Sequence, residues 1–168
     1  MVEVVEYERK GHVALISLNR PEARNALSPE MLVRLADTWT EVRDDPQVRV
    51  AVVTGAGDKA FCSGGDQKQR LETGDYGPTE TGLFEVETLH RAVRDIPKPV
   101  IAAVNGVAVG GGHVLHVLCD ITIAAEHARF GQVGPRVGSF DAGFGSAYLA
   151  RIVGEKRARE IWYCTRLY

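Results

Sequence analysis

Two continuous apolar segments constrain what this chain can fold into. They are VRVAVVTGAG at 48–57 and PVIAAVNGVAV at 99–109, and both are followed by further glycines. Short apolar runs bounded by glycine are typical of strands buried inside a sheet. The segments at 27–46 and 84–97 instead carry apolar residues at helical spacing. Because strands and helices alternate along the chain, the sequence predicts an α/β architecture with helical crossovers.

The remaining segments fit the same alternation. Residues 2–20 predict a β-hairpin that turns at Lys10 and Gly11. Ser28 is a favourable N-cap and Pro29 suits the first position of the helix at 27–46. Further along, the patterns predict a polar loop at 67–82, a helix at 110–120, a strand segment at 121–131, and a helix from 145 that breaks near Gly154 and runs to Tyr168.

Composition limits the class of protein. The chain has 168 residues, 45% hydrophobic and 25% charged, which predicts one soluble globular domain over 1–168. A formal charge of −2 gives no electrostatic reason to expect nucleic acid or an anionic membrane. No apolar stretch approaches the ~18 residues of a membrane span, and no signal-peptide pattern is present. Cys62, Cys119 and Cys164 lie far apart, which favours reduced thiols in the cytoplasm.

A first glycine motif, TGAGDKA at 54–60, satisfies the GxGxxA pattern of dinucleotide-binding folds. That fingerprint needs a helix that opens at the second glycine and a later strand that ends in an acidic residue. The chain continues instead with AFCSGGDQ, where two more glycines interrupt any helix, and no such acidic residue follows. The pattern therefore argues against a nicotinamide cofactor.

Two further glycine clusters, FCSGGDQ at 61–67 and AVGGGHVLH at 108–116, each follow an apolar strand. One interpretation is that both are tight turns in which only glycine fits the backbone. The other is that their exposed N–H groups converge on one substrate oxygen and form an oxyanion hole. A helix that begins near Gly112 would add positive potential at that point. Spacing alone leaves both interpretations open.

Four motifs in order then carry a family resemblance. NRPEARNALS, FCSGGDQ, NGVAVGGG and CDITIAAEHARFGQ together resemble the crotonase (enoyl-CoA hydratase/isomerase) superfamily over essentially all 168 residues. The resemblance implies a spiral of ββα turns that binds an acyl-coenzyme A thioester as substrate. It also implies a homotrimer or hexamer, and a C-terminal helical region that is missing here, so the chain is expected to be truncated.

The resemblance assigns roles to individual residues. It places the two oxyanion N–H groups on Gly65 and Gly111, and it implies no metal. His113, His116 and Asp120 share one helix face, but packed histidines are favoured over a metal site there. Contacts to substrate and coenzyme A are implied for Arg24, Ser63, Gly64, Asp66, Gln67, Tyr76, Val107, Val109, Gly110 and Val133.

The acids and bases differ from those of the hydratases. Where the hydratases carry two catalytic glutamates, this chain has Val114 and Gly134, so hydration by two glutamates is not expected. The motifs SGGDQ, GGGHVLH and FGQVGPRVGSFDAG instead resemble the naphthoate synthases of menaquinone biosynthesis. Those enzymes close the second ring of o-succinylbenzoyl-CoA to give 1,4-dihydroxy-2-naphthoyl-CoA, by an intramolecular Claisen (Dieckmann) condensation.

This closer resemblance implies a bicarbonate ion as base, held near Gln132 and Gly134, and catalytic roles for Asp141 and Ser139. From the residues alone, Asp141 equally suits a turn or a helix N-cap. TGLFEVETLHRAVRDIPKPVIA and VGEKRAREIWY also resemble 2-ketocyclohexanecarboxyl-CoA hydrolases, which open a ring. Another hydratase or isomerase of the superfamily, and a non-catalytic acyl-CoA-binding subunit, are the remaining alternatives.

Overall fold

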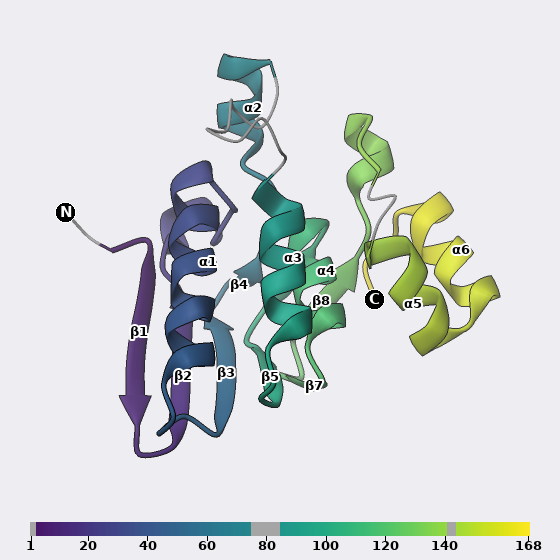
Figure 1. Cartoon of the computed structure of the whole chain (residues 1–168). Helices are drawn as coiled ribbons and strands as arrows, with labels where there is room; N and C mark the ends of the chain where they lie inside the picture. Colours follow the sequence, from purple (N-terminus) through teal and green to yellow (C-terminus); the bar gives the residue numbers. More distant parts are fainter. Residues whose placement is uncertain (1–2, 75–84, 141–143) are drawn as a thin grey trace.

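The computed structural model describes residues 3–74, 85–140 and 144–168 (Figure 1). Its strands form two sheets, one of five strands in the order β1-β2-β3-β5-β7 and one of three in the order β4-β6-β8. In the large sheet the strands are β1 (Val5–Lys10), β2 (Val13–Leu18), β3 (Val50–Gly55), β5 (Val100–Val104) and β7 (Ile121–Ala124). The small sheet contains β4 (Ala60–Cys62), β6 (Val107–Val109) and β8 (Arg129–Gly131).

The chain repeats one unit along its length. A strand of the large sheet is followed by a strand of the small sheet and then by helix, three times in succession. β3, β5 and β7 pair in parallel, and so do β4, β6 and β8. The predicted α/β spiral of ββα turns is therefore confirmed. The predicted hairpin is also confirmed, because β1 and β2 pair antiparallel from Val5↔Leu18 to Lys10↔Val13.

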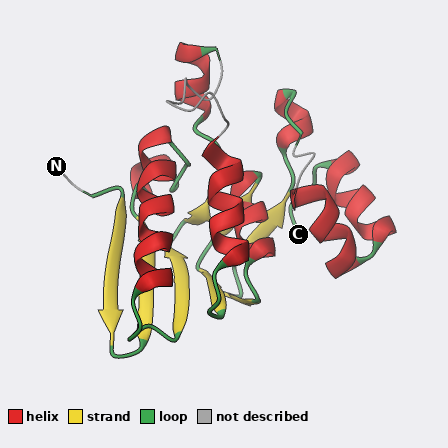
Figure 2. Ribbon diagram, viewed as in Figure 1, coloured by secondary structure: helices red, strands yellow, loops and turns green. Residues whose placement is uncertain are grey.

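Helices cover one face of the large sheet (Figures 1 and 2). Residues alternate between buried and half-buried along β2 and β3, as expected for strands with one face in the core. The helices that pack into this core are α1 (Pro29–Asp44), α3 (Glu85–Asp95) and α4 (Gly111–Leu118). The largest side chains buried between the helices and the sheet include Ile16, Leu18, Met31, Leu35, Trp39, Phe61, Leu89 and Leu115.

A smaller cluster lies at the end of the molecule opposite β1 (Figure 1). Helices α5 (Phe144–Val153) and α6 (Glu155–Cys164) form a hairpin whose buried side chains pack on Val117 of α4. These side chains are Leu149, Ala158, Ile161 and Trp162. No helix in the described parts of the chain is long and apolar enough to cross a membrane.

The predicted loop at 67–82 is wrong in its first half, which forms helix α2 (Gln67–Thr73). The Asp66 side chain accepts hydrogen bonds from the backbone N–H groups of Lys68 and Gln69, and so caps the helix. Gly74 ends α2 in a left-handed conformation. Polar composition therefore concealed a short capped helix. From residue 75 to its end at 82, the predicted loop lies outside the described residues.

Each of two predicted single strands is in fact two strands that belong to different sheets. The segment 99–109 divides into β5 and β6 at Asn105 and Gly106, where the Asn105 amide donates to the carbonyls of Gly55 and Gly57. A Cβ on Gly106 would lie 2.5 Å from the Lys59 carbonyl oxygen, so only glycine fits this corner. The segment 121–131 divides in the same way into β7 and β8.

The last helix was expected to continue to Tyr168 but ends at Cys164. Thr165 takes the left-handed conformation that glycine usually supplies, and its N–H donates to the Ile161 carbonyl. The backbone groups of Tyr168 then exchange two hydrogen bonds of 2.9 Å with Phe130 of β8. The end of the chain is therefore extended backbone that pairs with the small sheet.

The Ser28 cap offers a direct test of the first helix. Ser28 Oγ accepts a hydrogen bond from the Met31 N–H at 3.2 Å, at the start of α1. Ser28→Ala should lower the free energy of unfolding by about 1 kcal/mol. The measurement is urea denaturation, with Ser28→Thr, which keeps the oxygen, as the control. Equal stability of Ser28→Ala and wild type would show that the cap contributes nothing.

Candidate active site

Two glycine stretches that are far apart in the sequence meet in the structure, backbone against backbone. Gly64 has φ +85, and a Cβ on it would lie 3.0 Å from the Val109 carbonyl and 3.1 Å from the Gly111 nitrogen. A Cβ on Gly111 would lie 3.9 Å from the Gly65 nitrogen. The structure therefore brings together Gly65 and Gly111, the two residues predicted to form an oxyanion hole.

The hydrogen bonding of their neighbours leaves both N–H groups available. Leu27 receives one bond from the Asp66 N–H at 3.1 Å and gives one to the Gly64 carbonyl at 2.8 Å, so the Gly65 N–H points away from Leu27. Gly111 is the first residue of α4, where an N–H has no partner inside the helix. Within the described parts of the chain, neither N–H has a recorded backbone acceptor. Two free donors beside a helix N-terminus suit a developing negative charge.

Gly112 and Cys62 explain how α4 comes so close to β4. A Cβ on Gly112 would lie 2.7 Å from the Cys62 Cβ and would collide with the Cys62 carbonyl oxygen. Complete burial raises the pKa of the Cys62 thiol to about 12, so the thiol stays protonated and serves packing. The third glycine of the GGG motif is therefore required for packing, while the second presents its N–H.

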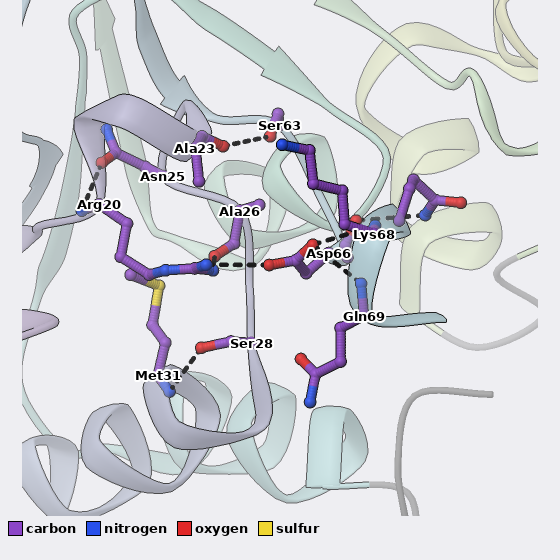
Figure 3. Close-up of polar contacts among 12 residues, drawn as sticks. Arg20, Ala23, Asn25, Ala26, Ser28, Met31, Ser63, Asp66, Lys68 and Gln69 are labelled. Atoms are coloured by element: carbon purple, nitrogen blue, oxygen red, sulfur yellow. Dashed lines mark hydrogen bonds and ion pairs between the residues drawn. The ribbon is translucent and has the colours of Figure 1, made fainter. Parts of the chain in front are cut away.

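The segment Arg20–Ser28 supports the other side of the site (Figure 3). Asn25 is buried with φ +54, and its amide donates to the carbonyls of Ala56 at 3.0 Å and Ala60 at 2.8 Å. The Asn25 side-chain oxygen, Oδ1, accepts from the Arg20 N–H at 2.9 Å. The Ser63 N–H in turn donates to the Arg24 carbonyl at 3.1 Å. This segment therefore fills the space beside the β3–β4 turn and holds the backbone that leads to Gly65.

Asp66 and Gln67, both predicted to contact substrate, make contacts within the protein. The Asp66 carboxylate pairs with Arg20 at 2.9 Å while it caps α2. Burial raises the pKa of Asp66, but the Arg20 hydrogen bond and the α2 N–H groups outweigh burial, so this pKa lies below its usual value. Gln67 donates to the Gly65 carbonyl at 3.2 Å. The role of Arg20 could not be predicted from the sequence, because no local pattern points to a partner 46 positions away.

The other predicted substrate contacts differ in exposure. Arg24 is exposed, with a left-handed backbone at φ +54. Ser63, Val107, Gly110 and Val133 are half-buried, and Val109 is buried. Tyr76 lies outside the described residues.

The residues predicted to hold bicarbonate have close partners of their own. The Gln132 side chain is buried, and its amide nitrogen donates to His113 Nδ1 at 3.2 Å. A Cβ on Gly134 would lie 2.6 Å from the Ser139 carbonyl oxygen, and the Ser139 N–H donates back to the Gly134 carbonyl at 2.9 Å. This close approach accounts for the glycine at 134 without an ion, and the bicarbonate site stays a prediction. Asp141 falls outside the described residues.

The two histidines of α4 pack against each other. The His113 and His116 ring centroids lie 4.7 Å apart in an edge arrangement, and His116 Nδ1 lies 3.2 Å from Thr122 Oγ1. Burial lowers the pKa of His113 to about 4, and burial with the nearby His113 lowers that of His116 to about 3. Among the described residues, no group of three or more His, Cys, Asp or Glu side chains could hold a metal ion.

Comparison with known proteins places this arrangement in context. A family model described as enoyl-CoA hydratase/isomerase matches residues 8–168. An enoyl-CoA hydratase from Bacillus anthracis is 36% identical over 98% of this chain and 64% of its own, with a TM-score of 0.88. An enoyl-CoA hydratase/carnithine racemase from Magnetospirillum magneticum is 30% identical over 100% of this chain and 63% of its own, with a TM-score of 0.87.

A monofunctional enoyl-CoA isomerase from M. smegmatis is 34% identical over 99% of this chain and 70% of its own, with a TM-score of 0.82. The chain therefore spans just under two thirds of the length of the first two of these structures. None of the three is described as a naphthoate synthase. The predicted trimer or hexamer remains a prediction.

Gly112→Ala tests the close packing of α4 on β4. The added methyl group meets the Cys62 carbonyl, so the start of α4 must move, which should cost about 1–3 kcal/mol of unfolding free energy. The same movement should weaken binding of an acyl-CoA. Gly11→Ala is the control, because its φ of +61 strains the backbone although no atom lies within 4 Å of the added group. If Gly112→Ala binds and unfolds like Gly11→Ala, the packing argument fails.

The buried histidines predict how stability depends on pH. The folded-state pKa of His113 is lowered from 6.5 to about 4, so between these values the unfolded chain binds more protons. The free energy of unfolding should therefore fall as the pH falls through this window, by up to about 3 kcal/mol for His113. His113→Gln should flatten the slope measured by urea denaturation from pH 7 to 4. A slope that stays the same in a folded His113→Gln protein would contradict the prediction.

Proposed function

Because the chain belongs to the enoyl-CoA hydratase/isomerase family, we propose that it is an enzyme that binds an acyl-coenzyme A thioester and stabilises its enolate. The observation that carries the proposal is the convergence of the Gly65 and Gly111 backbones, each with an unpaired N–H. Removal of an α proton from a thioester moves negative charge onto the carbonyl oxygen. Donors that are already in place stabilise this charge, and one such donor lowers the activation barrier by about 3–4 kcal/mol.

The position of α4 supports the same chemistry. Its N-terminus begins at Gly111, and six of its eight residues are buried, so its dipole is fixed in direction. A thioester oxygen between the two N–H groups would therefore lie at the positive end of a rigid helix. Backbone donors cannot rotate away as side chains can, so little reorganisation is needed when the charge develops.

For the reaction itself, the proposal is ring closure of o-succinylbenzoyl-CoA. Val114, at the first position where hydratases carry a glutamate, is fully buried in the core. Gly134, at the second, has no side chain and packs against Ser139. Neither position can move a proton, which favours a base from outside these two positions. Bicarbonate near Gln132 and Gly134 would act as that base, and Ser139 with Asp141 would supply hydrogen bonds or protons to the second carbonyl.

A second candidate, isomerisation or hydration of an enoyl-CoA, is favoured by the descriptions of the similar structures. It would require a proton-transfer group other than residues 114 and 134. The reverse Claisen reaction, which opens a ring, shares the same oxyanion hole and is the third possibility. All three reactions pass through an enolate, so the same oxyanion hole would serve each of them.

The first test is an absorbance assay with o-succinylbenzoyl-CoA in bicarbonate-free buffer and again after bicarbonate is added back. Naphthoyl-CoA formed only with bicarbonate is the expected result. Crotonyl-CoA and 2-ketocyclohexanecarboxyl-CoA are assayed in parallel. Turnover of crotonyl-CoA alone would show hydration instead of ring closure, and turnover of 2-ketocyclohexanecarboxyl-CoA alone would show ring opening. A non-catalytic subunit would bind butanoyl-CoA without exchanging its α protons in D₂O, which would overturn the proposal that the chain is an enzyme.

A further inference from the structure

Arg20 lies on the segment that leads into α1, and its side chain points toward Asp66 at the start of α2 (Figure 3). Its side chain is 21% exposed and its guanidinium has two partners. Nη1 donates to the Ala26 carbonyl at 2.8 Å, and Nη2 donates to Asp66 Oδ2 at 2.9 Å. The backbone N–H of Arg20 is also fixed, because it donates to the Asn25 side chain. Arg20 is therefore held at its guanidinium by Ala26 and Asp66, and at its backbone by the Asn25 side chain.

These two partners are adjacent to the two residues of the Leu27–Gly65 bridge. Ala26 precedes Leu27, and Asp66 follows Gly65. One guanidinium thus joins the two backbone segments at the point where they pair. The other carboxylate oxygen of Asp66 accepts from the N–H groups of Lys68 and Gln69, so Asp66 is held from both sides. The Gly65 N–H shares its peptide plane with the Gly64 carbonyl, which accepts from the Leu27 N–H at 2.8 Å, so its direction depends on how the Leu27 and Gly65 segments are held together.

We propose that Arg20 is a positioning residue that directs the Gly65 N–H into the oxyanion hole through its simultaneous bonds to Ala26 and Asp66. The inference rests on the proposed function, because it gives the Gly65 N–H a thioester oxygen to bind. Glycine is the residue with the freest backbone, so the direction of its N–H must be set by its neighbours. Arginine suits this task because its planar fork donates to two fixed acceptors at once.

The consequence of losing Arg20 is a misdirected donor. Displacement of a catalytic group by roughly 1 Å can cost about 100-fold in rate. Binding of the coenzyme A moiety does not depend on the direction of this one N–H, so affinity should change much less than rate. A purely structural role for Arg20 would instead lower stability and leave the polarisation of the bound thioester unchanged.

The test follows the carbonyl of bound butanoyl-CoA, labelled with ¹³C at the thioester carbon, by isotope-edited infrared spectroscopy on the full chain. Hydrogen bonds to the carbonyl oxygen lower its stretching frequency. Wild type should show a lowered frequency relative to free butanoyl-CoA. In Arg20→Met most of that shift should be lost, so the band should move back toward the frequency of free butanoyl-CoA. The dissociation constant of butanoyl-CoA should remain within about threefold of wild type, which is under 1 kcal/mol.

Two further variants make the result specific. Asp66→Asn weakens the same contact from the other side while an asparagine can still cap α2, so its band should move in the same direction. Arg9→Met is the control, because Arg9 on the β1–β2 hairpin likewise bonds one carbonyl, that of Gly11, and pairs with one aspartate, Asp45 at the end of α1. Its band should equal that of wild type, and thermal melting identifies which variants are folded.

The outcomes separate this proposal from the one on which it rests. A wild-type band without any shift would overturn the oxyanion hole, and the role of Arg20 with it. A shifted wild-type band that stays unchanged in a folded Arg20→Met or Asp66→Asn protein would overturn the role of Arg20 alone. An equal loss of shift in Arg9→Met would also overturn it, because the effect would then reflect general destabilisation.

Discussion

The rest of the structure depends on one constraint, the contact of two glycine backbones at the ends of β4 and β6. Gly112 lies so close to Cys62 that a Cβ is excluded, and Gly64, with φ +85, lies so close to the Val109 carbonyl and the Gly111 nitrogen that a Cβ would strain both backbones. The parallel pairing of β4 with β6 aligns the ends of both strands at one edge of the small sheet. Any side chain at these glycines would separate the strand ends and carry the two N–H groups apart. The two glycines that must be small, Gly64 and Gly112, are therefore the immediate neighbours of Gly65 and Gly111, which carry the two donors.

Core packing makes this contact rigid. An isolated helix as short as α4, with eight residues, is not stable in water, so its position must come from tertiary packing. Val114 and Leu115 are buried in the main core, while Val117 contacts the smaller cluster of α5 and α6. Because α4 is held from both clusters, its N-terminus cannot easily rotate away from Gly65. On the opposite side the Arg20–Asp66 pair supports the second donor, which has no helix of its own to hold it.

The local features of the structure could be predicted from the sequence, whereas contacts between residues far apart in the sequence could not. Alternating strands and helices predicted the α/β architecture, and the family resemblance implied the spiral of ββα turns. The glycine clusters at 64–65 and 110–112 indicated where backbone would be exposed. The Arg20–Asp66 pair spans 46 positions, and the pairing of Tyr168 with Phe130 depends on where β8 lies, so neither has a local signal. The division of 99–109 into two strands was also missed, because hydrophobicity does not report which sheet a strand joins. Asp141, the residue on which the reaction type depends most, lies outside the described residues.

Backbone groups and side chains would have separate roles in the proposed reaction: the backbone supplies the hydrogen-bond donors, and side chains supply the groups that move protons. In each ββα turn the chain crosses from one sheet to the other, so loops from successive turns lie at the same edge and deliver the backbone donors. The donors are fixed by packing, and their effect is the same for any thioester. The groups that move protons must instead come from side chains, and this chain has a buried valine at 114 and no side chain at 134. Replacement of such side chains leaves the packing of the glycines intact, so one scaffold can keep the enolate while the fate of that enolate changes.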